Sequence, residues 1–106
     1  MSSAIQTRFN VGQIVKHALF EYVGVGVDVD GEFSGTDDWY GRMARTSPPK
    51  DAPWYHVLVE DADHMTYVAE RNLAVVDEAR PIRHPMVEEY FRDFRDGGYV
   101  VREVLN

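Results

Sequence analysis

Three acidic side chains, Asp28, Asp30 and Glu32, lie close together in the sequence and could bind a cation. The letters D-x-D-G at this point invite comparison with a calcium-binding loop. An EF-hand loop, however, requires glycine at its position 6 and a bidentate glutamate at its position 12. Counting from Asp28, a glycine falls at position 4 and Trp39 at position 12. We therefore interpret these acids as turn and surface groups, and we predict no metal site.

Histidine is the other residue type here that could ligate a metal or move a proton, and the chain contains His17, His56, His64 and His84. None has the H-E-x-x-H spacing of a helical zinc site. His17 and His56 fall on predicted strands, so a pair with Asp28 or Asp30 across a sheet is one interpretation. The alternative, which we favour, is that each histidine satisfies a local polar contact.

The sequence contains no catalytic or cofactor-binding motif. It lacks G-x-S-x-G and a phosphate-binding loop, and it has no cysteine for thiol catalysis, disulfides or cysteine metal sites. Gly24-Val25-Gly26 lies within a predicted strand, without the third glycine or the following helix of a dinucleotide site. We therefore predict no catalytic residues, no cofactor and no enzymatic activity.

Aromatic and basic residues are interleaved along one stretch of the chain, between residues 39 and 54. Such interleaving can stack nucleobases and hold phosphates. Because acidic residues accompany the basic ones, we favour a solvated mixed-charge loop, with nucleic-acid contact as the alternative. Trp39 and Tyr40 either pack back over the barrel or anchor a partner, and packing is the favoured interpretation.

Length and composition indicate a single domain over residues 1–106. The chain has 106 residues, of which 44% are hydrophobic and 12% aromatic, enough for one core. Its formal charge is -7, and residues 80–106 hold equal numbers of acidic and basic side chains, so the whole of that charge lies in residues 1–79. This balance argues against tight general binding of DNA or RNA. With no signal peptide and no membrane-spanning stretch in view, we predict a cytoplasmic protein.

Alternating apolar residues predict five short strands, over residues 11–17, 22–30, 54–60, 65–69 and 73–76. In the second strand, the residues expected to share one buried face are Val23, Val25, Val27 and Val29. The third strand carries apolar residues on both faces, so we expect it to be central. The strands indicate a mainly β fold, a small SH3-like barrel over about residues 9–78, with a long loop over residues 31–53 between the second and third strands.

The hydrophobic pattern changes period after Pro81, which predicts a helical tail over about residues 84–106. The residues at helical spacing are Val87, Tyr90, Phe91 and Phe94. Pro85 suits the first turn of a helix, and Gly97-Gly98 suits its end. A helix of about ten residues is therefore expected to pack its aromatic stripe on the barrel, followed by an extended end over residues 99–105.

Five segments spread over nearly the whole chain point to a known family. They are FNVGQIVKHALFEYVGVGVDVDGEF, TDDWY, APWYHVLVED, TYVAERNL and RHPMVEEYF. Together they resemble the heat-shock protein HspQ family, also called the YccV-like or hemimethylated-DNA-binding family. The resemblance implies a small β-barrel without enzymatic activity, and two roles. One is binding of hemimethylated origin DNA with an effect on replication initiation, and the other is an adaptor role for the ATP-dependent protease Lon.

Charge favours the second of these roles, because a chain of formal charge -7 is repelled overall by a phosphate backbone. We therefore expect a non-enzymatic heat-shock adaptor for Lon, with hemimethylated DNA as the alternative partner. A structural subunit that forms homo-oligomers is a third hypothesis. The expected partner contacts are Trp39, Tyr40, Trp54 and His56. The residues expected to face phosphates, if DNA binds, are Lys16, Arg42, Arg45 and Lys50.

Overall fold

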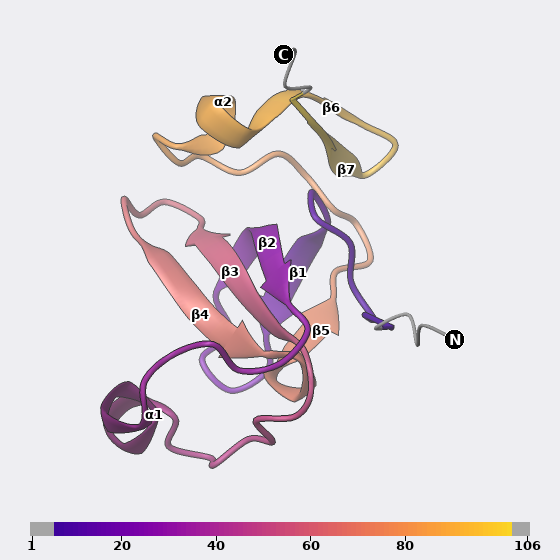
Figure 1. The fold of residues 1–106 in the computed structure, drawn as a ribbon. Helices are drawn as coiled ribbons and strands as arrows, with labels where there is room; N and C mark the ends of the chain where they lie inside the picture. The colour runs from indigo at the N-terminus through magenta and orange to yellow at the C-terminus, as the bar shows by residue number, and fades with distance from the viewer. Residues whose placement is uncertain (1–5, 103–106) are drawn as a thin grey trace, which may run out of the picture.

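The main element of the protein is a five-stranded antiparallel sheet, seen in the computed structural model, which describes residues 6–102 (Figure 1). Its strands are β1 (Ile14–His17), β2 (Val23–Asp30), β3 (Trp54–Val59), β4 (Met65–Ala69) and β5 (Leu73–Val75). They lie in the order β4-β3-β2-β1-β5, and the 3-10 turn η1 (Glu70–Asn72) joins β4 to β5. All five predicted strands are confirmed, and their ends differ from the predicted ends by at most three residues.

The sheet does not close into a hydrogen-bonded barrel within residues 6–102. β4 and β5 are its two edge strands, and no ladder of hydrogen bonds joins them. The predicted mainly β class and the five strands are thus confirmed, whereas closure of the barrel is not observed. One consequence is that β4 keeps an unpaired edge, which lies at the margin of the sheet, near α1 (Figure 1).

β3 carries apolar side chains on both faces, as predicted, and lies between β2 and β4. Tyr55 and Val57 face one core, whereas Leu58 faces another. The first core consists of Phe9, Val15, Tyr55, Val57, Val68 and Leu73, and the second of Ile14, Val25, Val27, Leu58, Ile82 and Phe91. Burying each large side chain contributes about 2 kcal/mol, before the entropy of ordering the chain is counted.

A bulge in β2 changes which of its side chains face the second core. Val25 belongs to that core but Val29 packs against the first one, so the expectation that the four valines share a face is wrong for Val29. The register of β2 against β3 shifts between Gly26 and Asp28, where an extra residue is accommodated. After the shift, Asp28 lies opposite His56 on β3.

The segment predicted as one long loop, residues 31–53, contains a short helix, α1 (Asp37–Met43). Its N-cap is Thr36, whose side-chain oxygen accepts a hydrogen bond of 3.1 Å from the backbone N–H of Trp39. Two aspartates in the first turn complement the positive end of the helix dipole. These groups are a sequence signal for a helix start, so the prediction of an uninterrupted loop is corrected here.

The prediction of a C-terminal helix of about ten residues is wrong. One turn is helical, α2 (Val87–Tyr90), and a hairpin of β6 (Phe91–Arg95) and β7 (Gly98–Val101) follows it. The two loop residues, Asp96 and Gly97, have φ angles of 52° and 82°, as a type I′ turn requires at its central positions. Residues 103–105 of the predicted extended end lie outside the described residues. Neither helix in the described part of the chain is long and apolar enough to cross a membrane.

The C-terminal hairpin packs on the sheet, where the aromatic stripe was expected. Phe91 is buried in the second core, and Phe94 and Tyr99 pack against that core. The Tyr99 backbone N–H donates to the Gly12 carbonyl oxygen at 2.8 Å, and its hydroxyl accepts from the Ile82 N–H at 2.9 Å. In Figure 1 this unit lies at the opposite end of the sheet from α1. The face of the sheet that carries the second core is therefore covered at its two ends by different parts of the chain.

We expect Gly24→Ala to lower the free energy of unfolding by about 2 kcal/mol, because β3 approaches β2 too closely there for a side chain. A Cβ atom at Gly24 would overlap the Leu58 carbonyl oxygen and lie 2.6 Å from Val57 Cγ1. Gly26→Ala is the matched control, since the nearest atom to its Cβ would be the Asn10 oxygen at 3.9 Å. Its expected effect is below about 1 kcal/mol. Urea unfolding followed by tryptophan fluorescence measures both, and equal effects would contradict this explanation.

Candidate functional site

Five aromatic side chains form a cluster between α1 and the adjoining ends of β3 and β4. They are Phe33, Trp39, Tyr40, Trp54 and Tyr67, called the aromatic cluster below. The Phe33 ring centroid lies 4.9 Å from that of Trp54 and 5.4 Å from that of Tyr40. Trp39 packs edge-on against Trp54 at 6.1 Å. Contacts of this geometry are favourable beyond the area they bury, so the cluster holds α1 on the sheet.

Hydrogen bonds fix the segment that joins α1 to β3. The Tyr40 hydroxyl donates to the Pro48 carbonyl oxygen at 2.6 Å, and Trp54 Nε1–H donates to the Pro49 carbonyl oxygen at 3.0 Å. Both donors come from the aromatic cluster, and both acceptors from the connecting segment. The cluster is therefore a fixed wall of the molecule, and Trp39 and Tyr40 pack on the sheet, as the favoured interpretation expected.

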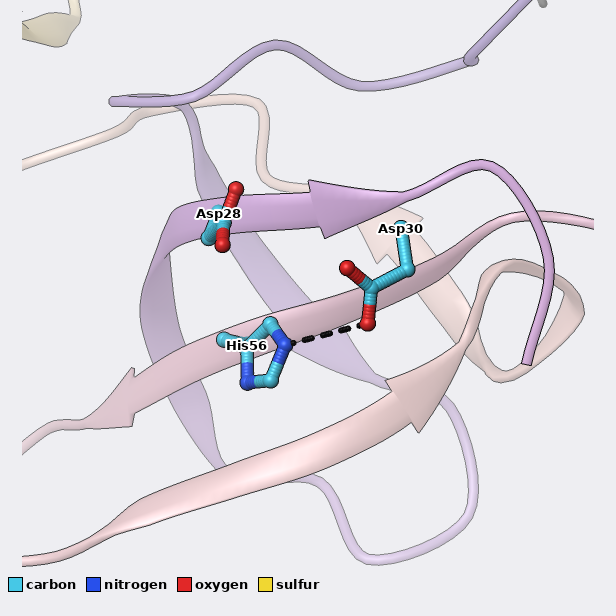
Figure 2. Close-up of side chains that lie close together, drawn as sticks. All are labelled: Asp28, Asp30 and His56. Carbon is cyan, nitrogen blue, oxygen red and sulfur yellow. Dashed lines mark hydrogen bonds and ion pairs between the residues drawn. The ribbon is translucent and has the colours of Figure 1, made fainter. Parts of the chain in front are cut away.

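A hydrogen-bonded network of polar side chains lies next to the aromatic cluster. Asp30 Oδ2 is 3.3 Å from His56 Nε2 and accepts a hydrogen bond of 2.6 Å from the Tyr67 hydroxyl. Figure 2 shows the Asp30 carboxylate reaching from the end of β2 toward His56 on β3. Burial, reinforced by the hydrogen bond to Asp30, raises the pKa of Tyr67 to about 12. Tyr67 therefore remains a donor to Asp30 at neutral pH, and the histidine–carboxylate pair that the sequence left open is formed by His56.

Asp28, Asp30 and His56 together offer the donor atoms that a divalent cation would need, one from each residue, all within 4.8 Å of one another (Figure 2). Asp30 Oδ2, however, already serves Tyr67 and His56. Asp28 Oδ1 accepts a hydrogen bond of 2.9 Å from the Val29 backbone N–H. These atoms are therefore already partners within a hydrogen-bonded network, and exposed acidic groups of this kind are common without an ion.

A pocket of about 480 Å³ lies beside β4, next to the aromatic cluster. Its walls come from the turn between β1 and β2, from α1 and the segment after it, and from β4 itself. Three of the large apolar side chains most exposed in the described residues stand around it: Leu19 (52% exposed), Phe20 (68%) and Met43 (61%). Exposed apolar side chains gathered around one hollow are typical of a binding surface, whereas isolated ones are not.

His17 holds the turn that carries two of these exposed residues. Its Nδ1 accepts hydrogen bonds from the backbone N–H groups of Leu19 (3.1 Å) and Phe20 (3.2 Å). Its ring also stacks on the Phe20 ring, with centroids 4.6 Å apart. An imidazole that accepts at Nδ1 carries no proton there. Burial lowers the pKa of His17 below 6.5, which keeps the ring neutral and the turn in place at neutral pH.

The structure brings together the four residues that were predicted to contact a partner. Trp39 and Trp54 belong to the aromatic cluster and line the pocket, and His56 lines it from β3. Tyr40 belongs to the cluster but does not line the pocket. Their contact with a partner stays a prediction.

Sequence reasoning missed Phe20, Phe33 and Tyr67. Tyr67 lies directly opposite His56 in the β3–β4 ladder. The predicted strand ends would have placed Tyr67 opposite Leu58, two residues away on the same face of β3. Phe33 lies in a stretch without periodicity, and Phe20 lies in a turn. No local pattern indicated either of them, because both reach the site through tertiary packing.

The residues predicted to face phosphates, Lys16, Arg42, Arg45 and Lys50, are not gathered at the pocket. Arg42 Nη2 pairs with Asp38 at 3.3 Å, and Lys50 Nζ pairs with Asp37 at 3.0 Å. Lys50 also lies 4.4 Å from the Tyr40 ring centroid, in a cation–π contact. Of the four residues, only Arg45 lines the pocket. The pairs match the favoured interpretation of this stretch as a mixed-charge segment.

The pocket lining carries no carboxylate, although the chain contains 18 aspartates and glutamates. Its charged and titratable groups are Arg45, three histidines (His17, His56 and His64) and two tyrosines (Tyr22 and Tyr67). Arg45 is exposed, and none of the ion pairs formed among residues 6–102 includes it. The pocket is therefore an apolar hollow with a positive group at its rim, on a molecule that is acidic as a whole.

A protein-family model matches most of the chain. Its description is "Hemimethylated DNA-binding protein YccV like", and the match covers residues 7–98. This range includes the five-stranded sheet, the aromatic cluster and the pocket. The description names a binding activity and no catalytic one, in keeping with a site built from apolar walls and hydrogen-bonded polar groups.

We expect the free energy of unfolding to fall as the pH drops from 7 to about 5, through protonation of His17. Because the pKa of His17 is lower in the folded protein, the unfolded chain binds the proton first, and stability present above pH 6.5 is lost on acidification. Urea unfolding at several pH values measures this slope. His17→Gln should flatten it, whereas Val75→Ser, an exposed substitution that removes no titrating group, should not. An unchanged slope in His17→Gln would show that His17 does not control the turn.

Proposed function

The chain belongs to the YccV-like family, as its sequence predicted, and we propose that it acts as a non-enzymatic heat-shock adaptor that modulates proteolysis by the ATP-dependent protease Lon. The observation that carries this proposal is the pocket beside β4, around which Leu19, Phe20 and Met43 are exposed. Covering apolar surface is favourable by about 25 cal/mol per Å². An adaptor that binds apolar segments of other proteins would gain affinity from such a surface.

The dimensions and walls of the pocket support a protein partner. Its volume of about 480 Å³ is within the range of roughly 300–1,000 Å³ that is typical of small-molecule sites, so the pocket can enclose a side chain of a partner but not a whole segment. The aromatic cluster forms one rigid wall, so little ordering entropy is lost there on binding. Denatured proteins expose apolar segments that folded proteins bury. A preformed apolar hollow would therefore favour denatured chains, which are substrates of a stress protease.

Charge supports the same choice of partner. The formal charge of -7 repels a phosphate backbone, and Arg42 and Lys50 are already paired with neighbouring aspartates. Arg45 is therefore the positively charged side chain at the pocket. One such group suits a single carboxylate on a protein better than the row of phosphates along a duplex.

We expect the purified protein to change the rate at which Lon degrades a denatured substrate, and we expect Phe20→Ser with Met43→Ser to weaken the effect roughly tenfold at limiting adaptor concentration. Both side chains are exposed, so the double variant should fold normally. Val75→Ser is the matched control, because Val75 is 59% exposed on β5 and does not line the pocket. An equal rate of degradation with and without the wild-type protein would overturn the proposal.

Binding of hemimethylated DNA, with an effect on replication initiation, is the second candidate function. Two observations favour it: the description of the family, and the presence of Arg45, Trp39 and Trp54 in the lining of one pocket. Aromatic faces stack on nucleobases, and a nearby arginine can contact a phosphate. Net charge opposes this candidate.

For the second candidate, we expect weak binding without preference for methylation state. Fluorescence anisotropy would compare hemimethylated, fully methylated and unmethylated forms of one duplex at about 50 and 200 mM salt, between which phosphate-dominated binding separates. Submicromolar binding that prefers the hemimethylated duplex would contradict the charge argument and support DNA as the ligand. Arg45→Glu should then weaken binding, with Arg92→Glu, an exposed residue of β6, as the control.

A further inference from the structure

The outer edge of β4 offers backbone hydrogen-bonding groups that the described part of the chain leaves unused. The Val59 N–H donates to the His64 carbonyl oxygen, and the Glu70 N–H donates to the Pro53 carbonyl oxygen. In an antiparallel ladder, hydrogen-bonded and non-hydrogen-bonded pairs alternate. Alternation between these two bonds turns the N–H and C=O groups of Met65, Tyr67 and Ala69 away from β3. Ala69, however, is only 3% exposed and is the N-cap of η1, so its groups are not open to a partner. The main-chain bonds found elsewhere in residues 6–102 include none from the groups of Met65 and Tyr67.

The pocket follows this same edge. Its lining includes every residue of β4, from Met65 to Ala69. Thr66 and Val68 point to the side of the first core, whereas Tyr67 lies across from His56 on the other side. A hollow bordered by both faces of one strand runs along the edge of that strand. An occupant of the pocket is therefore held within reach of the unused backbone groups.

The chemistry of the walls defines the occupant. Exposed Phe20 and Met43 and the aromatic cluster call for an aromatic or large aliphatic side chain. The lining has no carboxylate and has Arg45 at its rim, so a negative group on the occupant is accepted and a positive one is not. Unused N–H and C=O groups at every second residue match an extended peptide, and nucleobases do not present that repeat.

We propose that an extended segment of a partner polypeptide adds to the edge of β4 as a sixth strand. It places one aromatic or large aliphatic side chain in the pocket and a neighbouring carboxylate against Arg45. This inference rests on the proposed function, because it names what the adaptor holds. The edge supplies affinity through main-chain hydrogen bonds, and the pocket and Arg45 determine which partner sequences bind.

The probe is a short fluorescein-labelled peptide of alternating valine and threonine, capped at both ends, with one central phenylalanine followed by an aspartate. We expect saturable binding in fluorescence polarisation. Replacing the phenylalanine by serine, or the aspartate by lysine, should each weaken it roughly tenfold. Amide hydrogen exchange gives a second readout. The amides of Met65 and Tyr67 should gain protection with peptide, whereas those of Thr66 and Val68, already bonded to β3, should change little.

Met65→Pro tests the edge directly. Met65 is the first residue of the edge strand β4 and its N–H points away from β3, a position at which proline is tolerated. We expect it to weaken peptide binding roughly tenfold, and Met65→Ala, which removes the side chain and keeps the N–H, to weaken binding much less. Arg45→Glu should weaken binding of the aspartate peptide and improve binding of the lysine peptide. Arg92→Glu, the same charge change on an exposed residue of β6, should do neither.

Three outcomes would overturn the inference. The first is peptide binding that the Arg45 and Met65 substitutions leave unchanged, or no binding at all. The second is self-association of the protein that Met65→Pro abolishes, which would make a second copy of this chain the occupant of the edge. The third is protection of the β4 amides by DNA and not by peptide. Because peptide binding is measured without Lon, its failure and the failure of the protease assay are separate results.

Discussion

The position of β3 between β2 and β4, with apolar side chains on both of its faces, determines where the rest of the chain must pack. One face is covered by the first core. The other is covered in three different ways along the strand: the C-terminal hairpin lies over Leu58, the polar network surrounds His56, and the aromatic cluster encloses Trp54. Water cannot be left against either face without a large loss of hydrophobic free energy. The hairpin, the network and α1 are therefore consequences of one strand that has to be covered on both sides.

The strands were predictable from the sequence because alternation of apolar and polar residues is a local property. The β-bulges were not predictable, because a bulge is not a local property. In a regular strand, residues three apart point to opposite faces, and a bulge brings them to the same face. The ladder of β6 and β7 shifts between Phe91 and Asp93, so Phe91 and Phe94 both pack against the second core. Spacing of three is also what a helix produces, and the tail was predicted as a helix for that reason. In β2, the shift after Gly26 turned Val29 to the other core by the same mechanism.

For the candidate site, the types of residue in the sequence were informative, but the sequence did not show which side chains would pair with one another. Trp39 and Trp54 were identified because aromatic side chains interleaved with basic ones can contact a partner or a nucleic acid, and the two rings do meet. Whether a basic side chain is paired depended on contacts that its spacing in the sequence does not show. Lys50 reaches Asp37 across thirteen positions of the chain, and Arg71 reaches the Thr46 carbonyl oxygen across 25. A count of positive charges in the sequence therefore overstated how many of them are available to a ligand.

This acidic molecule presents a pocket free of carboxylates, and beside the pocket a partly buried network keeps the Asp30 charge turned away from it. Asp30 does not line the pocket, whereas its partners Tyr67 and His56 do. Their polar atoms point back to the carboxylate, so their rings are what faces the hollow. The pKa of about 12 keeps the Tyr67 proton on this bond at any physiological pH, and so the orientation of the ring does not depend on titration of the tyrosine. The same bond that satisfies Asp30 thereby prepares an apolar wall for a ligand.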